Sequence, residues 1–367
     1  MDKIIRDKKK VAQRKLDSQE CIKCHKTKKI TDFTQPLRSC KTCVNAYQNT
    51  RINSSIIAYL KVSCNTAKSR TSEKLARGRI EASKYEIDVE YLMTIYEQQE
   101  GKCYYLGVPL VFHRYSDWQC SLERLNPDLG YIVGNVALIA GEFQHSTQWT
   151  IEKYQEFITL INIVHDPIQI DWYFRKERRE YSTVEKFVEN GIIYIKCKIC
   201  ENAKEEDQFY DITKYGCKAC VAIQGKEYLE TPFGYLTCKL SCMKASSKKR
   251  NHNPPSITIE DMMQIIDAQG GLCAYSGIPM TYGSYRDKRW TCSPERKDTS
   301  KGYTTENVCF VCWEFNTTDN TVRESEEIKS GSTGWSKEKI EFIKKFAVER
   351  AKASGVAEKL DGLAIVS

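Results

Sequence analysis

The chain has 367 residues, of which 41% are hydrophobic and 28% are charged, and its formal net charge is +8. This composition excludes global disorder, and the length allows two domains with separate cores. No apolar run reaches the roughly 18 residues of a membrane helix. Because the N-terminus is also charged, we expect no membrane partner and no signal peptide.

Seventeen cysteines would be compatible with a secreted disulfide scaffold. Eight of them, however, fall into the CxxC pairs at 21–24, 40–43, 197–200 and 217–220, in a chain that is large and rich in lysine. This usage indicates a reduced protein that binds zinc. We therefore expect an intracellular location, in the cytoplasm or the nucleus, which also suits a virus-encoded protein.

Three sequence blocks occur twice, in the same order. The CxxC pairs at 21–24 and 40–43 recur at 197–200 and 217–220. The pattern Gly-x-Cys-x-Tyr-x-Gly at 101–107 recurs at 271–277, and Trp-x-Cys-Ser-x-Glu-Arg at 118–124 recurs at 290–296. A duplicated chain can present two equivalent faces to a two-fold symmetric partner without dimerising. We expect a monomer that acts as a pseudo-dimer on double-stranded DNA.

The duplication divides the chain into seven segments, and the fold class that we expect is α+β in two tandem repeats. In chain order the segments are a basic N-terminal segment (1–17), a four-cysteine module (18–54), a larger unit (55–165), a linker (166–193), a second four-cysteine module (194–230), a second larger unit (231–350) and a tail (351–367).

Each larger unit is expected to begin with a basic helical segment, at about 55–80 and 234–250. An amphipathic helix follows, capped by Asp88 or Thr258, whose short side chains accept hydrogen bonds from first-turn amides. Next come the Gly-x-Cys-x-Tyr turn and a short strand pair that carries Glu-Arg. A further helix is expected to begin near Asn135 or Asn307. The closing helix is capped by Thr150 in the first repeat and Ser336 in the second.

Basic residues cluster in the helical segment of each repeat, and such clusters suit contacts with DNA phosphates. An ordinary solvated helix face explains them equally well. The candidate DNA-binding residues are Lys68, Arg70, Lys74, Arg77, Arg79, Lys244, Lys248, Lys249 and Arg250.

The two four-cysteine modules have the spacing of structural zinc sites. Two cysteines at i and i+3 bind one ion from a single knuckle turn, and a second pair, 15 or 16 residues further on, completes a tetrahedron of thiolates. Buried free thiols are the alternative. All eight ligands are cysteines, so no position stays open for chemistry: Cys21, Cys24, Cys40, Cys43, Cys197, Cys200, Cys217 and Cys220.

The pattern Ser-x-Glu-Arg, then Gly-Tyr-x-x-x-Asn-Val, then Glu-Phe-Asn resembles the HNH (ββα-metal) nucleases. With a four-cysteine module in front, it is most similar to restriction enzymes of this family in which Arg replaces the usual His. The resemblance covers about 18–145 and 194–317. It implies that 55–165 and 231–350 are two HNH nuclease units.

The resemblance also implies a role for each matching residue. Glu295 would be the strand metal ligand, Arg296 the residue at the His position, Asn307 the bracing Asn and Asn316 the helix metal ligand. The first repeat matches with Glu123, Arg124, Asn135 and Gln144. Two departures stand out: Glu replaces the usual Asp in both repeats, and Gln144 replaces the last Asn.

One carboxylate and one amide oxygen make a sparse, hard-oxygen site with positions left for water and phosphate, which suits Mg²⁺ or another divalent cation. The planar Arg296 guanidinium can hold phosphate oxygens. The general base is less defined. The resemblance implies a tyrosine, for which the candidates are Tyr275 and Tyr105, while a packed tyrosine is the alternative. His113 or His145 is a further candidate base in the first repeat.

These features predict a metal-dependent, sequence-specific DNA endonuclease of the restriction or homing type, with two units in one chain. The main alternative is a zinc-dependent DNA-binding protein whose nuclease units have decayed. An RNA-cutting relative is the third. Retention of Glu-Arg and Asn in both repeats favours the enzyme.

Overall fold

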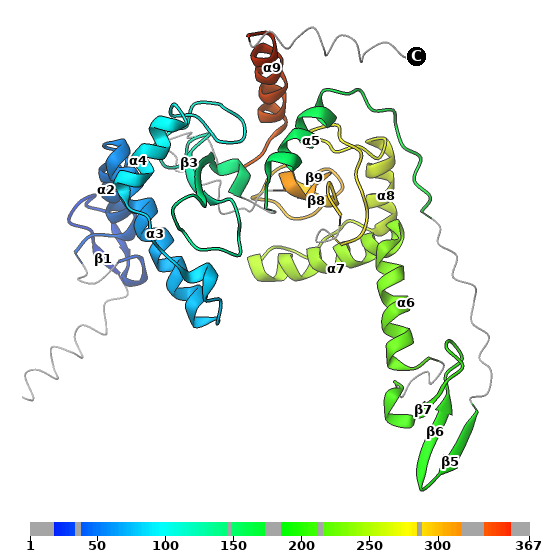
Figure 1. The fold of residues 1–367 in the computed structure, drawn as a ribbon. Helices are drawn as coiled ribbons and strands as arrows, with labels where there is room; N and C mark the ends of the chain where they lie inside the picture. The colour runs from blue at the N-terminus through cyan, green and yellow to red at the C-terminus, as the bar shows by residue number, and fades with distance from the viewer. Residues whose placement is uncertain are drawn as a thin grey trace, which may run out of the picture. The chain divides into compact units, whose positions relative to one another are not determined.

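The computed structural model describes residues 18–33, 38–144, 148–172, 185–210, 216–284, 288–316 and 334–353. The predicted basic segment 1–17, the candidate base His145 and residues 354–367 of the tail lie outside the described residues. The chain divides into two compact units, Met1–Gln144 with Val322–Thr333, and His145–Thr321 with Gly334–Ser367. Both are mixed α+β (Figure 1).

The first unit begins with a small zinc-knuckle-like hairpin and continues into helices that cover a second hairpin. Its elements are β1 (Ser18–Glu20), β2 (Thr27–Lys29), η1 (Ile30–Asp32), α2 (Lys41–Ile52), α3 (Ile56–Ala76), η2 (Glu81–Ser83), α4 (Val89–Gln98), β3 (Cys120–Arg124), β4 (Val136–Ala140) and η3 (Gly141–Gln144).

The second unit has the same order of main elements, with an additional helix at each end and one additional strand, β5. Its elements are α5 (Ile151–Ile161), β5 (Lys186–Glu189), β6 (Ile192–Lys196), β7 (Ala203–Glu205), η4 (Glu206–Gln208), α6 (Lys218–Glu230), α7 (Pro232–Arg250), α8 (Ile259–Ala268), β8 (Cys292–Arg296), β9 (Val308–Cys312), η5 (Trp313–Phe315) and α9 (Lys337–Ala353). Among the described residues, no helix combines the length and apolar character that a bilayer crossing requires.

The predicted helix caps are confirmed. Asp88 accepts a hydrogen bond from the amide of Tyr91 (2.8 Å) at the start of α4. Thr258 and Asp261 form a reciprocal capping box at the start of α8, and Thr150 caps α5. Each cap satisfies first-turn amides that have no partner within the helix.

The helices predicted to begin near Asn135 and Asn307 are wrong, because strands β4 and β9 begin at the next residue. Both strands are continuous runs of apolar residues, buried along their whole length. Such short runs favour a strand enclosed on both faces. Each pairs antiparallel with the strand that carries Glu-Arg, so that Glu123 lies opposite Ala137 and Glu295 opposite Cys309.

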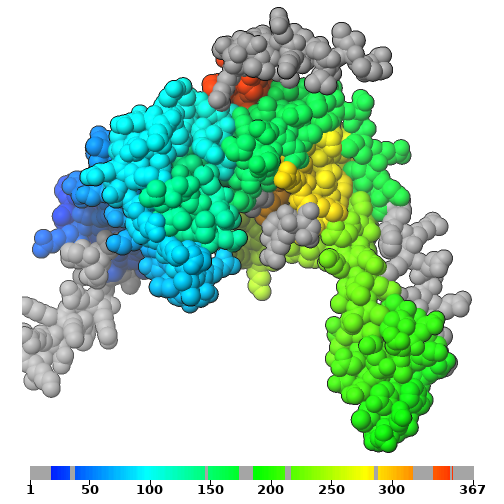
Figure 2. Space-filling view, viewed as in Figure 1, coloured from blue at the N-terminus to red at the C-terminus, as the bar shows by residue number. Residues whose placement is uncertain are grey.

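A hairpin lies across the end of the predicted linker, since β5 falls within 166–193. Its turn is formed by Asn190 and Gly191, both with positive φ (51° and 78°), as a tight type I′ hairpin requires. Strands β5, β6 and β7 form one sheet. This sheet lies at the end of α6 that is remote from the β8–β9 hairpin of the same unit (Figure 1), and its residues form a green lobe in the space-filling view (Figure 2).

One basic-segment helix packs on the Glu-Arg hairpin in each unit. Tyr59 of α3 donates its hydroxyl to the carbonyl of Cys120 (2.7 Å), and Tyr235 of α7 does the same with Cys292 (2.5 Å). Both tyrosines are buried. These equivalent contacts anchor the helix across the first residue of strands β3 and β8.

Helix α5 belongs to the first repeat in sequence, yet it packs within the second unit. Phe157 lies 5.4 Å from the ring of Phe315 and 6.1 Å from that of Trp290. Beside these rings, Lys153 forms a buried ion pair with Glu314 (2.9 Å). The first-repeat segment 148–161 therefore completes the core around β8 and β9.

Candidate metal centres and acid–amide sites

Each predicted four-cysteine set comes together in space. Within each set the four Sγ atoms lie within 4.8 Å of one another, as a tetrahedral metal site requires. Both groups can bind a zinc ion. They are the groups of this kind found among the described residues: Cys21, Cys24, Cys40 and Cys43, and Cys197, Cys200, Cys217 and Cys220.

The backbone of each module is folded as a knuckle. In the first, His25 has a positive φ of 54° and its amide donates to the carbonyl of Cys21 (2.8 Å). In the second, Glu201 (φ 60°) makes the same bond to Cys197. The side chain of His25 is exposed and pairs with Glu20 (3.2 Å), so it points away from the cluster.

In each cluster, hydrogen bonds from backbone amides lower the pKa of a cysteine and so favour its thiolate form. The amide of Cys40 donates to Sγ of Cys21 (3.2 Å) and lowers the pKa of that thiol to about 6. In the second cluster burial raises the pKa of Cys197, but the amides of Cys200 and Cys217 outweigh burial and lower it to about 6. Thiolates are the metal-binding form, so Cys21 and Cys197 are the cysteines of each cluster best prepared to bind a cation, whereas burial raises the pKa of Cys43 and the hydrogen bond with Cys217 raises that of Cys220.

In the first unit, the predicted metal-ligand pair converges. The amide of Gln144, at the end of η3, donates to the carbonyl of Leu122 (3.2 Å) and to the carboxylate of Glu123. Glu123 is 8% exposed. A carboxylate and an amide therefore meet at the end of β3, and Gln144 occupies a 3-10 turn rather than the predicted helix.

In the second unit, Asn316 takes the equivalent place. Its side-chain nitrogen donates to the carbonyl of Pro294 and to the hydroxyl of Ser293, both at 2.9 Å. Pro294 matches Leu122 of the first unit, so both amides bind the residue that precedes the glutamate. Glu295 is 6% exposed. Because the nitrogen of Asn316 is bound to β8, its amide oxygen is the atom that can ligate a cation.

The bracing asparagines hold the loop between the two strands. Asn307 accepts from the amide of Asp298 (2.9 Å) and donates to the carbonyls of Asp298 (3.0 Å) and Gly302 (2.9 Å). Asn135 makes the same three bonds in its own loop, to Asn126 and Gly130. Each side-chain amide thereby closes the loop that carries Gly-Tyr.

The arginines of Glu-Arg also contact this loop. Nη1 of Arg296 donates to the carbonyls of Thr299 (3.0 Å) and Lys301 (2.9 Å), and the guanidinium lies 5.3 Å from the ring of Tyr303. Nη1 of Arg124 donates to the two equivalent carbonyls. Arg296 is buried. The sequence predicted phosphate binding but not this loop-closing role of Nη1.

The two candidate tyrosines differ in environment. Tyr105 is buried and packs against Phe143, with ring centroids 5.4 Å apart. Tyr275 is partly exposed. Burial and then the carboxylate of Glu295 raise its pKa. These protein groups oppose deprotonation of Tyr275, contrary to what a general base requires.

Sequence reasoning missed His252. It lies just after α7, and its Nε2 is 3.4 Å from Nη1 of Arg296. The nearby amide of Ser256 donates to the carbonyl of Tyr303 (3.1 Å), which draws this segment to the Glu-Arg loop. The first-repeat candidate His113 is exposed and contacts Arg114 and Ser116. No sequence pattern indicated His252, because this residue precedes the Glu-Arg motif by more than forty positions.

The candidate DNA-binding residues follow α3 and the end of α7. All are exposed except Lys74, which is partly buried. Lys248, Lys249 and Arg250 occupy the last turn of α7, where cations also stabilise the helix dipole. Lys74 is different, since its Nζ is buried with no hydrogen-bond partner among the described residues and lies 5.8 Å from the ring of Tyr131.

Comparison of the chain with protein-family models, curated proteins and solved structures finds no match. The geometry of the residues themselves is therefore the basis for any functional argument.

Proposed function

We propose that this chain is a metal-dependent DNA endonuclease of the HNH type, with two nuclease units in one polypeptide and structural zinc in both four-cysteine clusters. The observation that carries the proposal is the recurrence of one constellation. In each unit an almost buried glutamate ends a strand beside a side-chain amide, and an asparagine closes the adjoining loop.

The donor set fits a hard divalent cation. Glu295 and Asn316, and equally Glu123 and Gln144, can hold Mg²⁺ through one carboxylate and one amide oxygen. When bound, the ion polarises a phosphate and stabilises the leaving oxygen. Asn307 holds the loop in position, and we assign Arg296, whose Nη1 fixes the same loop, to contact with the phosphate.

The water that attacks phosphorus needs a proton acceptor. Tyr275 adjoins Glu295, and His252 adjoins Arg296. We expect His252→Gln to lower the cleavage rate more than Tyr275→Phe does, because the surroundings of Tyr275 hold its hydroxyl proton. Single-turnover cleavage of a defined duplex measures both rates. An unaffected His252→Gln enzyme would leave the tyrosine as the acceptor.

The second candidate function is DNA binding by decayed nuclease units. The observation that favours it is the burial of Arg296 and the use of its Nη1 within the loop. Under this alternative the clusters and the basic helices keep their roles, and the acid–amide pairs are remnants.

Plasmid cleavage distinguishes the two functions. Supercoiled DNA is incubated with the full chain and magnesium, and the products are separated as nicked and linear forms. We expect Glu295→Gln and Glu123→Gln each to convert double-strand cutting into nicking, and the double variant to be inactive. Glu100→Gln, an exposed carboxylate, is the control and should cut normally. DNA binding without cutting by the wild type, under every divalent metal, would establish the alternative.

A further inference from the structure

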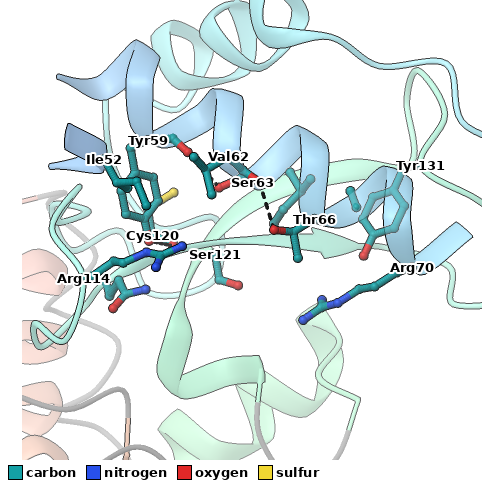
Figure 3. Close-up of a pocket in the computed structure, with 13 residues that line it drawn as sticks. Ile52, Tyr59, Val62, Ser63, Thr66, Arg70, Arg114, Cys120, Ser121 and Tyr131 are labelled. Atoms are coloured by element: carbon teal, nitrogen blue, oxygen red, sulfur yellow. Dashed lines mark hydrogen bonds between the residues drawn. The ribbon is translucent and has the colours of Figure 1, made fainter. Parts of the chain in front are cut away.

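A groove of about 160 Å³ runs between α3 and β3 in the first unit (Figure 3). One wall is a single stripe of α3, in which Tyr59, Ser63, Thr66 and Arg70 recur at the three- and four-residue spacing of one helix face. The opposite wall includes residues 120–122 of β3. The groove therefore follows the strand that ends in Glu123 and Arg124.

The charge of this groove is uniformly positive. The side chains of Arg114 and Arg70 extend into it from opposite ends, with Ser121 between them (Figure 3). None of the lining residues that the structure describes is acidic. Ser63, Thr66 and Ser121 add hydroxyl groups along its length. The hydroxyls of Ser63 and Thr66 donate to the carbonyls of Tyr59 (3.3 Å) and Val62 (2.9 Å) in their own helix, so the two guanidinium groups supply the phosphate-binding chemistry.

Arg114 is held in place by neutral groups. Its backbone amide donates to Oδ1 of Asn53 (3.1 Å), and its Nη1 donates to Oδ1 of Asn49 (3.4 Å). Across the described part of the chain, neither Arg114 nor Arg70 forms an ion pair. Both retain a full positive charge that no protein anion neutralises.

The far end of the groove adjoins the candidate acid–amide site. Tyr131 lines this end, and the guanidinium of Arg124 lies 5.6 Å from its ring. The unpartnered Nζ of Lys74 lies over the same ring. Cationic groups thus continue from Arg114, past Arg70, to the residue that follows Glu123.

We propose that this groove binds the phosphodiester backbone of a DNA strand, with Arg70 and Arg114 each contacting one phosphate of that strand, and leads the strand to Glu123. The inference rests on the proposed function and identifies the surface through which the first unit binds its substrate. In the second unit, at the position matching Ser63, Lys239 lies over the rings of Tyr235 (4.8 Å) and Trp313 (5.0 Å).

The test measures binding of a labelled DNA duplex to the full zinc-loaded chain by fluorescence anisotropy, without magnesium, across a range of salt concentrations. Each phosphate contact contributes about 0.9 to the slope of log K against log salt. We expect Arg70→Gln with Arg114→Gln to reduce that slope by about 1.8. Lys61→Gln, an exposed cation of α3 that does not line this groove, is the matched control and should leave it unchanged.

Arg70→Lys with Arg114→Lys keeps the charge and should restore the slope, which separates lost contacts from misfolding. If the wild type binds and cuts while the glutamine variant keeps the full slope, the groove proposal fails and the nuclease stands. If the slope falls as expected but no metal supports cutting, the groove stands and the nuclease proposal fails. A wild type that binds no duplex would overturn both.

Discussion

Asn135 and Asn307 each use one side-chain amide to satisfy three backbone groups in the loop after Glu-Arg. Both are buried. A buried polar group that loses its partner costs about 1–3 kcal/mol, so the amide should matter more to the loop than any single hydrogen bond suggests. Both asparagines therefore stabilise the fold, whatever role they have in catalysis.

Replacing Asn307 with Ala should lower the stability of the second unit by about 2–4 kcal/mol, since two carbonyls and one amide lose their partner. Calorimetric melting of the full chain measures the loss. Asn316→Ala is the comparison, and should convert double-strand cutting into nicking with a smaller effect on melting. Equal losses for both variants would contradict the assignment of distinct roles.

Lys74 provides a prediction about pH. Burial, followed by repulsion from Arg124, Arg70 and Arg79, lowers its pKa to about 8 from an ordinary value near 10.5. The unfolded chain therefore binds more protons than the folded chain between pH 8 and 10.5, and this group makes stability rise with pH in that window.

Accordingly, Lys74→Met should raise the melting temperature at pH 7, where the wild type carries an uncompensated ammonium. The difference should shrink as pH rises from 8 to 10.5. Lys61→Met, on the exposed side of the same helix, should have no pH-dependent effect. A constant difference at all pH values would show that the charge of Lys74 is not the cause.

The sequence could predict contacts between residues of the same motif. It could not predict contacts with segments that lie outside the motif. Glu123 and Gln144 were paired through the family resemblance, and in the structure the intervening hairpin brings strand end and turn together. The loop-closing use of Arg296 and the approach of His252 depend on where α7 ends in space. No spacing within the motif carries that information.

At the scale of elements, the four-cysteine modules should depend on metal. Each has a small buried cluster in which cysteines are prominent, with Phe33 or Phe209 as the aromatic member. So small a core rarely folds without a metal or disulfides. The thiolates therefore provide much of the stability that larger units obtain from apolar burial.

Cys200→Ser should reduce bound zinc from two ions to one per chain and unfold β6, β7 and the start of α6. Cys238→Ser, which changes an exposed cysteine outside the clusters, is the control and should keep both ions. Metal content by mass spectrometry and amide exchange of residues 192–208 provide the two measurements. Retention of two ions in Cys200→Ser would exclude the cluster as the binding site.

Elements with local signals were predicted, and those set by tertiary context were not. The caps of α4, α5 and α8 follow from one side chain and the first turn. Strands β4 and β9 were mistaken for helices, because a short apolar run suits either structure until its partner strand is known. The β5–β6 hairpin was overlooked although Asn190-Gly191 is a strong turn signal.

At the scale of the whole molecule, α5 ties the first repeat to the second unit. Phe157 lies among Trp290, Phe315 and Trp335, all of which are buried. Phe157→Ala should therefore destabilise the second unit by about 3–5 kcal/mol although it changes the first repeat.

Hydrogen exchange resolved by segment tests this assignment. Phe157→Ala should accelerate exchange in β8 and β9 and leave β3 and β4 unchanged. Gln155→Ala, on the exposed side of α5, is the control and should alter neither hairpin. Faster exchange confined to β3 and β4 would show that α5 packs in the first unit and contradict its assignment to the second.

The position of α5 also determines when the protein can mature. Phe157 emerges from the ribosome about 130 residues ahead of Trp290, a delay on the order of 10 s at ordinary elongation rates. During that interval Phe157 can contact Trp149, but its other aromatic neighbours, Trp290, Phe315 and Trp335, have not yet been synthesised. If the two repeats were expressed as separate chains, the second would lack α5. The two repeats of the duplication therefore no longer correspond to two independent folding units.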